Sequence, residues 1–131
     1  MARTSHEDAQ DIETMPGFEG RYADLEGYTV GFEVYDEDAD NAPLLRGLPG
    51  DVCPCRHWGY VLSGRAVYSY ADGEDEEYRA GDAYVARPGH SAFLEAGTEL
   101  VEFTPTDEHN ATMVVVNRNL AAAGADDQGW D

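Results

Sequence analysis

The chain has 131 residues, and its 27 acidic side chains against 8 arginines, with no lysine, give a formal net charge of −19 at pH 7. A surface this acidic repels phosphate backbones and anionic headgroups, so we expect binding to neither nucleic acid nor a membrane. Without lysine the chain can form neither a Schiff base nor a P-loop. At this length, with 42% hydrophobic residues, we expect one compact domain with its own core.

The first segment, MARTSHEDAQDIE, is acidic and lacks a positively charged start followed by an apolar stretch. It therefore does not resemble a signal peptide. No apolar run approaches the roughly 18 residues that a membrane-spanning helix needs. We expect a cytoplasmic protein whose cysteines are reduced.

Two polar ends flank a central region with β-strand patterns. Residues 1–16 are charged and residues 121–131 are small and acidic, so both are predicted as mobile tails around a domain at 17–120. Between them, short alternating runs of β-branched and aromatic residues are broken by glycine, proline and aspartate, which predicts an antiparallel sandwich or barrel. The expected strands cover residues 21–25, 28–35, 44–46, 53–62, 66–70, 76–79, 83–86, 92–95 and 100–103.

After Pro105 the sequence TDEHNATMVVVNRNLAAAG begins with Thr106 and acidic residues and ends at Gly124. This pattern predicts a C-terminal helix whose first-turn charges suit the helix dipole. The alternative is a strand at residues 114–116, which are three consecutive valines. The predicted fold class is all-β, a small antiparallel barrel with a C-terminal helix.

Two segments concentrate residues with metal-binding chemistry: CPCRHWGYVLSG at residues 53–64 and GDAYVARPGH at residues 81–90. In an extended strand alternate side chains share a face, so Cys53, Cys55 and His57 are expected to point the same way. Thiolate and neutral imidazole are the usual ligands of zinc. His90 is the other histidine of the β region and the candidate fourth ligand, since His6 and His109 fall in the N-terminal tail and the predicted helix.

Each of these residues also has a structural interpretation. Both cysteines could be small buried core residues. His57 could be a hydrogen-bonded core histidine and His90 a loop histidine. A disulfide between Cys53 and Cys55 is disfavoured, because both side chains would leave one short segment on the same side.

Alternation along the strands also makes Tyr68, Tyr84 and Glu102 candidates for the barrel interior. Glu102, within LVEFTP, is either the polar residue of a half-exposed strand or an inward carboxylate able to act as a general base. The sequence contains no nucleophile elbow and no glycine-rich phosphate loop, so nothing favours a hydrolase or a nucleotide-binding protein.

The stretch GYVLSGRAVYSYADGEDEEYRAGDAYVARPGH resembles the two-motif core of the cupin superfamily, in which a YVLxG strand is followed by a hairpin and a GDxxxxPPGH stretch. The resemblance covers roughly residues 28–105. More narrowly, the Cys-x-Cys-x-His-Trp-Gly-Tyr segment is similar to that of small bacterial cupin-domain proteins. The resemblance implies a jelly-roll barrel.

In the first motif, the resemblance places His57 at the position where cupins usually have a metal-binding glutamate. The two preceding histidine positions fall on Asp51 and Cys53. In the second motif the usual ligand histidine position holds Ala92, whereas His90 lies two residues earlier and would share its face. The usual set of three histidines and one glutamate is therefore absent.

The replacement set predicted from these residues is Cys53, Cys55, His57 and His90, with Asp51 in reserve, holding one divalent metal. Thiolate ligands shift the expected ion from manganese or iron towards zinc. Four protein ligands would indicate a structural ion, whereas three would leave an open position for water or substrate.

By analogy with cupins, the expected function is a small-molecule metalloenzyme of the dioxygenase, isomerase or lyase type. One alternative is a non-catalytic module that binds or senses a small ligand and has a structural metal. Another is a metal-free dehydratase or isomerase with His57 as acid and base. A homodimer formed through an exposed strand edge is expected.

Overall fold

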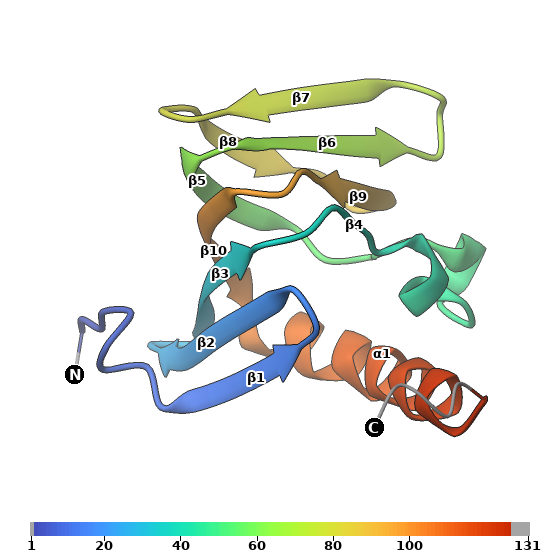
Figure 1. The fold of residues 1–131 in the computed structure, drawn as a ribbon, viewed down its shortest axis with the longest axis horizontal. Coiled ribbons are helices and arrows are strands. Elements are labelled where there is room, and N and C mark those ends of the chain that lie inside the picture. The colour runs from blue at the N-terminus through green and yellow to red at the C-terminus, as the bar shows by residue number, and fades with distance from the viewer. Residues whose placement is uncertain (1, 127–131) are drawn as a thin grey trace.

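The computed structural model describes residues 2–126 and shows two antiparallel sheets that face each other (Figure 1). The larger sheet consists of β1 (Asp11–Met15), β2 (Phe18–Leu25), β3 (Tyr28–Tyr35), β10 (Thr98–Pro105), β5 (His57–Ser63) and β8 (Ala83–Ala86), in that order. The smaller sheet consists of β4 (Ala39–Asp40), β9 (His90–Leu94), β6 (Arg65–Tyr70) and β7 (Asp75–Arg79). This interleaved strand order confirms the predicted jelly roll.

The core lies between the sheets because alternate side chains of each strand point inward. In β6, Ala66, Tyr68 and Tyr70 are buried while the residues between them are partly exposed. They face Val61 of β5 and Leu100 of β10, which have almost no exposed surface.

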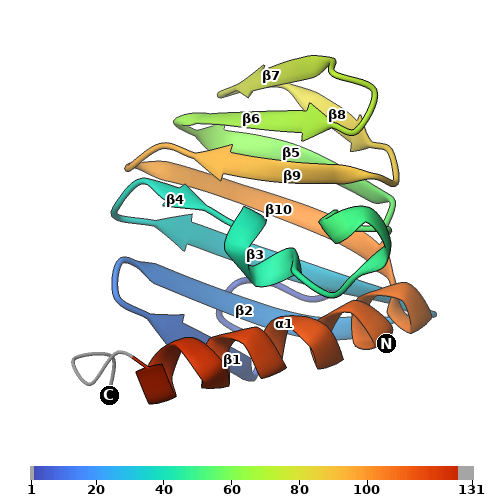
Figure 2. The ribbon, with the colours of Figure 1, turned by 90° about the vertical axis from the view of Figure 1, so that its right-hand side faces the viewer.

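Helix α1 (Thr106–Asp126) confirms the predicted C-terminal helix and excludes the alternative strand at residues 114–116. It runs along one side of the sheets (Figure 2), where Val115 and Val116 pack against a second apolar cluster. Asn119 Nδ2 donates hydrogen bonds of 2.8 Å to the carbonyls of Leu44 and Arg46, which fix the helix to the preceding loop. Within residues 2–126, no helical segment combines the length and hydropathy that crossing a membrane requires.

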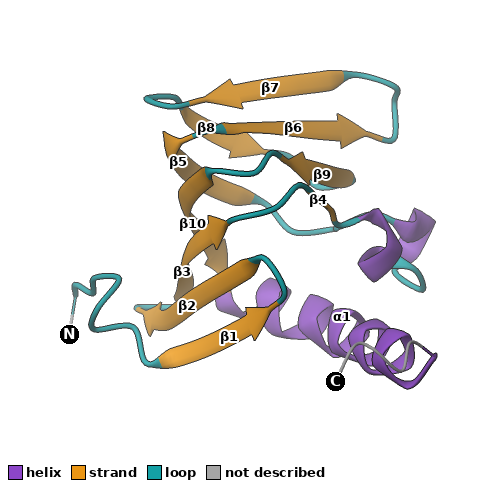
Figure 3. Cartoon of the chain, in the orientation of Figure 1, coloured by secondary structure: helices purple, strands orange, loops and turns teal. Residues whose placement is uncertain are grey.

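The predicted strand at residues 44–46 is wrong. The chain there forms the 3-10 helix η1 (Ala42–Leu45), which contacts α1, followed by a second 3-10 helix, η2 (Pro49–Asp51) (Figure 3). Pro43 lies at the start of η1, where a residue without an N–H costs no hydrogen bond. The Asp40 carboxylate also accepts a hydrogen bond from the Ala42 N–H, which favours the turn over a strand.

The ends of the folded region also differ from the expected ones. Part of the predicted tail at residues 1–16 is strand β1, an exposed edge strand paired with β2 along its whole length. β1 was not predicted as a strand because its charged residues interrupt the alternation of apolar and polar residues. Of the predicted tail at residues 121–131, residues 121–126 continue helix α1, and residues 127–131 lie outside the described part of the chain.

Candidate metal centre

The two sequence motifs meet at an isolated antiparallel bridge between Cys53 and His90. The Cys53 N–H donates to the His90 carbonyl at 2.7 Å, and the N–H groups of Gly89 and His90 donate to the Cys53 carbonyl at 2.7 and 3.3 Å. Directly opposed residues of an antiparallel pair have side chains on the same face. The backbone pairing therefore holds the thiol and the imidazole side by side, although the residues are far apart in the sequence.

His57 joins this pair from the first residue of β5. Its Nδ1 lies 2.7 Å from the hydroxyl of Thr104 on β10, and its Nε2 lies 3.9 Å from the Cys53 sulfur. The Cys53, His57 and His90 ligand atoms all lie within 4.8 Å of one another. A spacing of this kind is what three ligands need to reach one ion.

Cys55 does not join this group. Its sulfur lies 3.2 Å from the hydroxyl of Thr112 and 3.4 Å from the carbonyl of Glu108, both on α1. Regular strand structure begins only at His57, so the alternation that placed Cys55 beside Cys53 does not extend back to it. The structure records both thiols as free.

Asp51, the reserve ligand, also lies away from the group. Its carboxylate accepts a hydrogen bond of 3.0 Å from the Gly47 N–H, in the exposed turn that contains η2. Of the five residues considered from the sequence, the structure brings Cys53, His57 and His90 together and leaves Cys55 and Asp51 outside the cluster.

Each of the two imidazoles is held by a hydrogen bond at its Nδ1. The Nδ1–H of His90 donates to the Arg87 carbonyl at 2.6 Å, which leaves the Nε2 lone pair of His90 for a ligand. Burial, together with the nearby His57, lowers the pKa of His90 to about 4, so the ring is neutral at pH 7. The hydroxyl of Thr104 forms a hydrogen bond with Nδ1 of His57. The other ring nitrogen of His57, Nε2, is therefore directed towards Cys53.

The Cys53 thiol is protonated when no cation is present. The neighbouring Cys55 thiol raises the pKa of Cys53 first, and burial raises it further. The same interaction lowers the pKa of Cys55. A metal ion at Cys53 would displace the thiol proton, because the thiolate is the form that coordinates.

Glu102 of β10 lies next to the three residues and points inward, which confirms the inward placement in the second of the two sequence interpretations. Its carboxylate accepts hydrogen bonds from the hydroxyls of Tyr68 (2.5 Å) and Tyr84 (2.6 Å) and lies 3.8 Å from Nδ1 of His57. Burial would raise the pKa of Glu102, but the His57 charge and the two hydroxyls outweigh it and lower the pKa. An ionised carboxylate therefore persists in the barrel interior.

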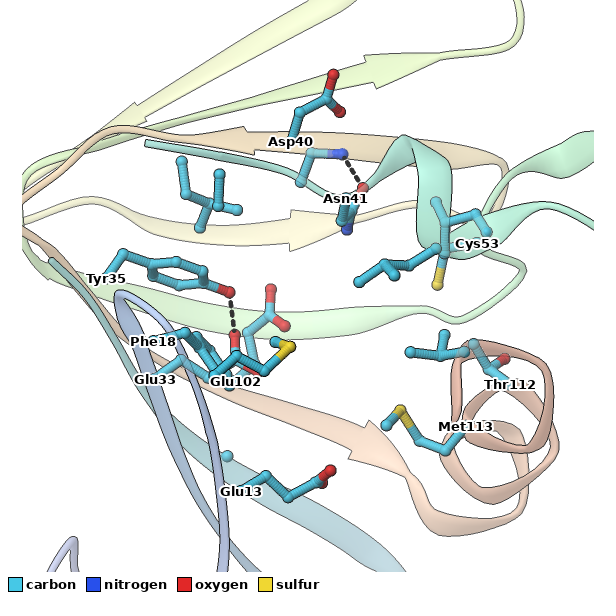
Figure 4. Close-up of a pocket in the computed structure, with 18 of the residues that line it drawn as sticks. Glu13, Phe18, Glu33, Tyr35, Asp40, Asn41, Cys53, Glu102, Thr112 and Met113 are labelled. Carbon is cyan, nitrogen blue, oxygen red and sulfur yellow. Dashed lines mark hydrogen bonds between the residues drawn. The ribbon is translucent and has the colours of Figure 1, made fainter. Parts of the chain in front are cut away.

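The cluster forms part of the wall of a cavity of about 420 Å³ that is lined by both sheets and α1 (Figure 4). A second carboxylate, that of the partly buried Glu33 of β3, lines the same cavity. It accepts hydrogen bonds from the hydroxyls of Tyr22 (2.6 Å) and Tyr35 (3.0 Å). Burial and the charge of Glu102 raise the pKa of Glu33 to about 7.

The sequence reasoning missed Glu33, Tyr22, Tyr35 and His109 as cavity residues. A signal for Glu33 was present: within YTVGFEVY it shares the period-two face of Thr29 and Gly31, which here points inward. His109 had no such signal, because only the docking of α1 against the sheet places it at the cavity.

Comparison with solved structures finds cupins. They include an RmlC-like cupin from Shewanella frigidimarina, with a TM-score of 0.52, 18% identity and coverage of 78% of this chain and 88% of that one. KdgF from a Halomonas species has a TM-score of 0.53 and 22% identity, over 80% of this chain and 93% of that one. The formate complex of oxalate decarboxylase from Lactobacillus farciminis has a TM-score of 0.58 and 17% identity, over 80% of this chain and only 32% of the decarboxylase.

Neither a scan against protein-family models nor a search of curated proteins finds a match. At these low identities the structural likeness establishes the fold and not the reaction. The chain has the cupin fold, in a small domain with a Cys/His cluster that could hold a metal.

Proposed function

We propose that this protein is a metal-binding cupin that acts on a small molecule, with one divalent ion held by Cys53, His57 and His90. The observation that carries the proposal is the convergence of one thiol and two imidazoles within 4.8 Å at the wall of a cavity. One sulfur and two nitrogen ligands favour zinc among the divalent ions.

Three protein ligands, rather than four, favour a reactive ion over a structural one. Cys55 would complete a closed four-ligand shell only by leaving its contacts with Thr112 and the Glu108 carbonyl. With three ligands, the remaining coordination position is free for water or for a ligand in the cavity. A bound ion would supply Lewis-acid chemistry there, polarising an oxygen of the substrate.

The chain's own contribution to such chemistry is a fixed carboxylate. Glu102 is held by Tyr68 and Tyr84, is ionised and lies beside the cluster, so it can accept a proton from a substrate in the cavity. Zinc has no redox chemistry, which favours the isomerase or lyase type of reaction over the dioxygenase type.

The metal-free alternative rests on the pair formed by His57 and Glu102. The imidazole Nδ1 and a carboxylate oxygen are 3.8 Å apart and both side chains are largely buried. In that case His57 is the acid and base, and Glu102 stabilises its protonated form.

Cobalt substitution distinguishes these functions. We expect the purified full chain, incubated with Co²⁺ and dialysed, to retain one ion and to show a sulfur-to-cobalt charge-transfer band. Cys53→Ser should lose the band and most of the ion, whereas Cys55→Ser should keep both. Loss of the ion in both variants would instead support the four-ligand, structural site. No retained ion in the parent protein would leave only the metal-free function.

We further propose that two copies of this chain associate, and that they do so through the outer face of the larger sheet rather than through the exposed strand edge expected from the sequence. Trp58, Val85 and Phe103 are direct cross-strand neighbours there, and all three are exposed. Tyr60 and Leu62 continue the exposed apolar surface along β5. On a chain with a net charge of −19, this face is where two copies can approach with the least repulsion. The free thiols of Cys53 and Cys55 suit a reducing compartment such as the cytoplasm.

A further inference from the structure

The walls of the cavity beside the metal cluster carry acidic groups and no fixed cation. The carboxylates that line it are Glu13, Glu33, Glu37, Asp38, Asp40 and Glu102. None of the arginines is among the described residues that line it, and the sequence has no lysine. Anion-binding sites are usually built from arginine, lysine or helix N-termini, so the lining disfavours a carboxylate or phosphate ligand.

The two innermost carboxylates are fixed in place by hydroxyl groups. Tyr22 and Tyr35 hold Glu33, and Tyr68 and Tyr84 hold Glu102. A hydroxyl donor stabilises a carboxylate but brings no positive charge. Apart from the histidines of the cluster and His109, the described lining of the cavity has no basic side chain that could offset the charge of these carboxylates.

A bound divalent ion would not reverse this balance. The Cys53 thiolate and the Glu102 carboxylate together offset a charge of +2, which leaves Glu33 and the acidic residues nearer the opening. A cation next to Glu33 would still meet a carboxylate whose charge the metal does not offset.

The rest of the cavity wall is apolar and aromatic. Phe18 and Tyr35 lie on one side, and Met113 of α1 lies on the other (Figure 4). Leu44 and Val116 add aliphatic surface. Aromatic faces favour organic cations, and thioether and aliphatic groups favour the carbon skeleton of such a ligand.

We infer that the cavity takes a cationic organic molecule, an ammonium with an apolar substituent, whose charged end lies at Glu33 and Glu102 and whose carbon skeleton packs against Phe18 and α1. This inference rests on the proposed function for the role of the site, since it names the class of substrate that would lie beside the metal. A neutral alcohol of the same shape binds more weakly, and the corresponding carboxylate is rejected.

Three probes with the same skeleton and different charge test the inference: 3-phenylpropylamine, 3-phenylpropan-1-ol and 3-phenylpropionate. Their binding to the zinc-loaded full chain is measured by calorimetry at pH 7.5. We expect the amine to bind at least about tenfold more tightly than the alcohol, and the carboxylate to bind least, because each charged buried contact is worth roughly this factor or more. Binding of the carboxylate as tight as that of the amine would overturn the inference, and so would no binding of any probe.

The matched variants are Glu33→Gln and Glu99→Gln, because Glu99 lies on β10 but is exposed and outside the cavity. Glu33→Gln should weaken amine binding about tenfold and leave alcohol binding unchanged, whereas Glu99→Gln should change neither. Equal effects of the two variants would contradict the role of Glu33. If Glu33→Gln does not fold, amine binding is measured on Tyr35→Phe, which removes a hydroxyl that holds Glu33. The three-probe comparison on the parent protein still tests the charge of the preferred ligand.

Metal content measured on the same samples separates the two proposals. Amine selectivity without bound metal would refute the proposed metal function and support the ligand class. Bound metal without amine selectivity would refute the ligand class alone.

Discussion

The ring of Tyr84 lies over Gly59, its direct partner on the neighbouring strand, at a distance that leaves no space for a side chain on Gly59. Glu102 is paired with Gly59 on one side and Gly31 on the other, and Gly31 is covered by the ring of Tyr22. One row across the larger sheet thus reads tyrosine, glycine, glutamate, glycine, tyrosine. The glycines let both rings lie flat on the sheet, with their hydroxyls at the two carboxylates.

Gly59→Ala is expected to destabilise the protein by about 1–3 kcal/mol, because a Cβ at Gly59 would overlap the Tyr84 ring in a packed interior. Urea unfolding measures the loss. In the double variant Gly59→Ala/Tyr84→Ala the clash is absent, so the cost of Gly59→Ala on the Tyr84→Ala background should be much smaller. An equal loss of unfolding free energy on the two backgrounds would show that the Tyr84 ring and a side chain at position 59 do not clash.

Glu33 should make the metal-free protein less stable as the pH rises. Its pKa is raised to about 7 from an ordinary value of 4.5, so the folded state holds a proton that the unfolded state has lost. The resulting stabilisation is present below pH 4.5 and disappears as the pH rises through 7, and amounts to ~3 kcal/mol.

Urea unfolding of chelator-treated protein at several pH values between 4.5 and 8 checks this. Between the ends of that range, the parent should lose ~3 kcal/mol of unfolding free energy relative to Glu33→Gln. The exposed control Glu99→Gln should follow the parent. Parallel pH profiles for the parent and Glu33→Gln would show that Glu33 titrates near its ordinary pKa.

His90→Ala should reduce the metal content and lower the melting temperature of the metal-loaded protein. A shared ion links the segment before β5 to the start of β9, and an ion that binds only the folded state adds its binding free energy to stability. Chelation should therefore shift the melting temperature of the parent but hardly affect the variant.

His109→Ala is the matched control, because His109 lines the cavity but is outside the cluster. It should keep the ion and the chelator-sensitive shift. If His90→Ala also kept both, His90 would have no part in metal binding.

Trp58→Ser and Phe103→Ser should each weaken dimerisation at least about tenfold, because a large aromatic at the centre of an apolar interface contributes most of its affinity. Sedimentation equilibrium measures the dissociation constant. Val114→Ser, an exposed apolar position on α1 away from this sheet face, should leave it unchanged. A monomeric parent protein at all concentrations would contradict the proposed dimer.

By itself, the sequence determined the architecture and most of the candidate metal site. Alternation of apolar and polar residues is a local property of each strand, so it predicted most strands, the inward side of Tyr68 and Tyr84, and one of the two possibilities for Glu102. Three of the four predicted ligands, Cys53, His57 and His90, lie together in the structure, and the fourth, Cys55, lies outside the cluster. Metal binding by these residues stays a prediction.

The tertiary structure decided what depends on how separate segments meet. Cys55 contacts α1 because the chain before His57 is not a regular strand, and the presence of Pro54, without an N–H, favours an irregular backbone there. Glu33 and Glu102 face one cavity because β3 and β10 pair in a register that only the folded sheet fixes. Pairing of distant strands and docking of a helix are non-local, and no pattern within one segment encodes them.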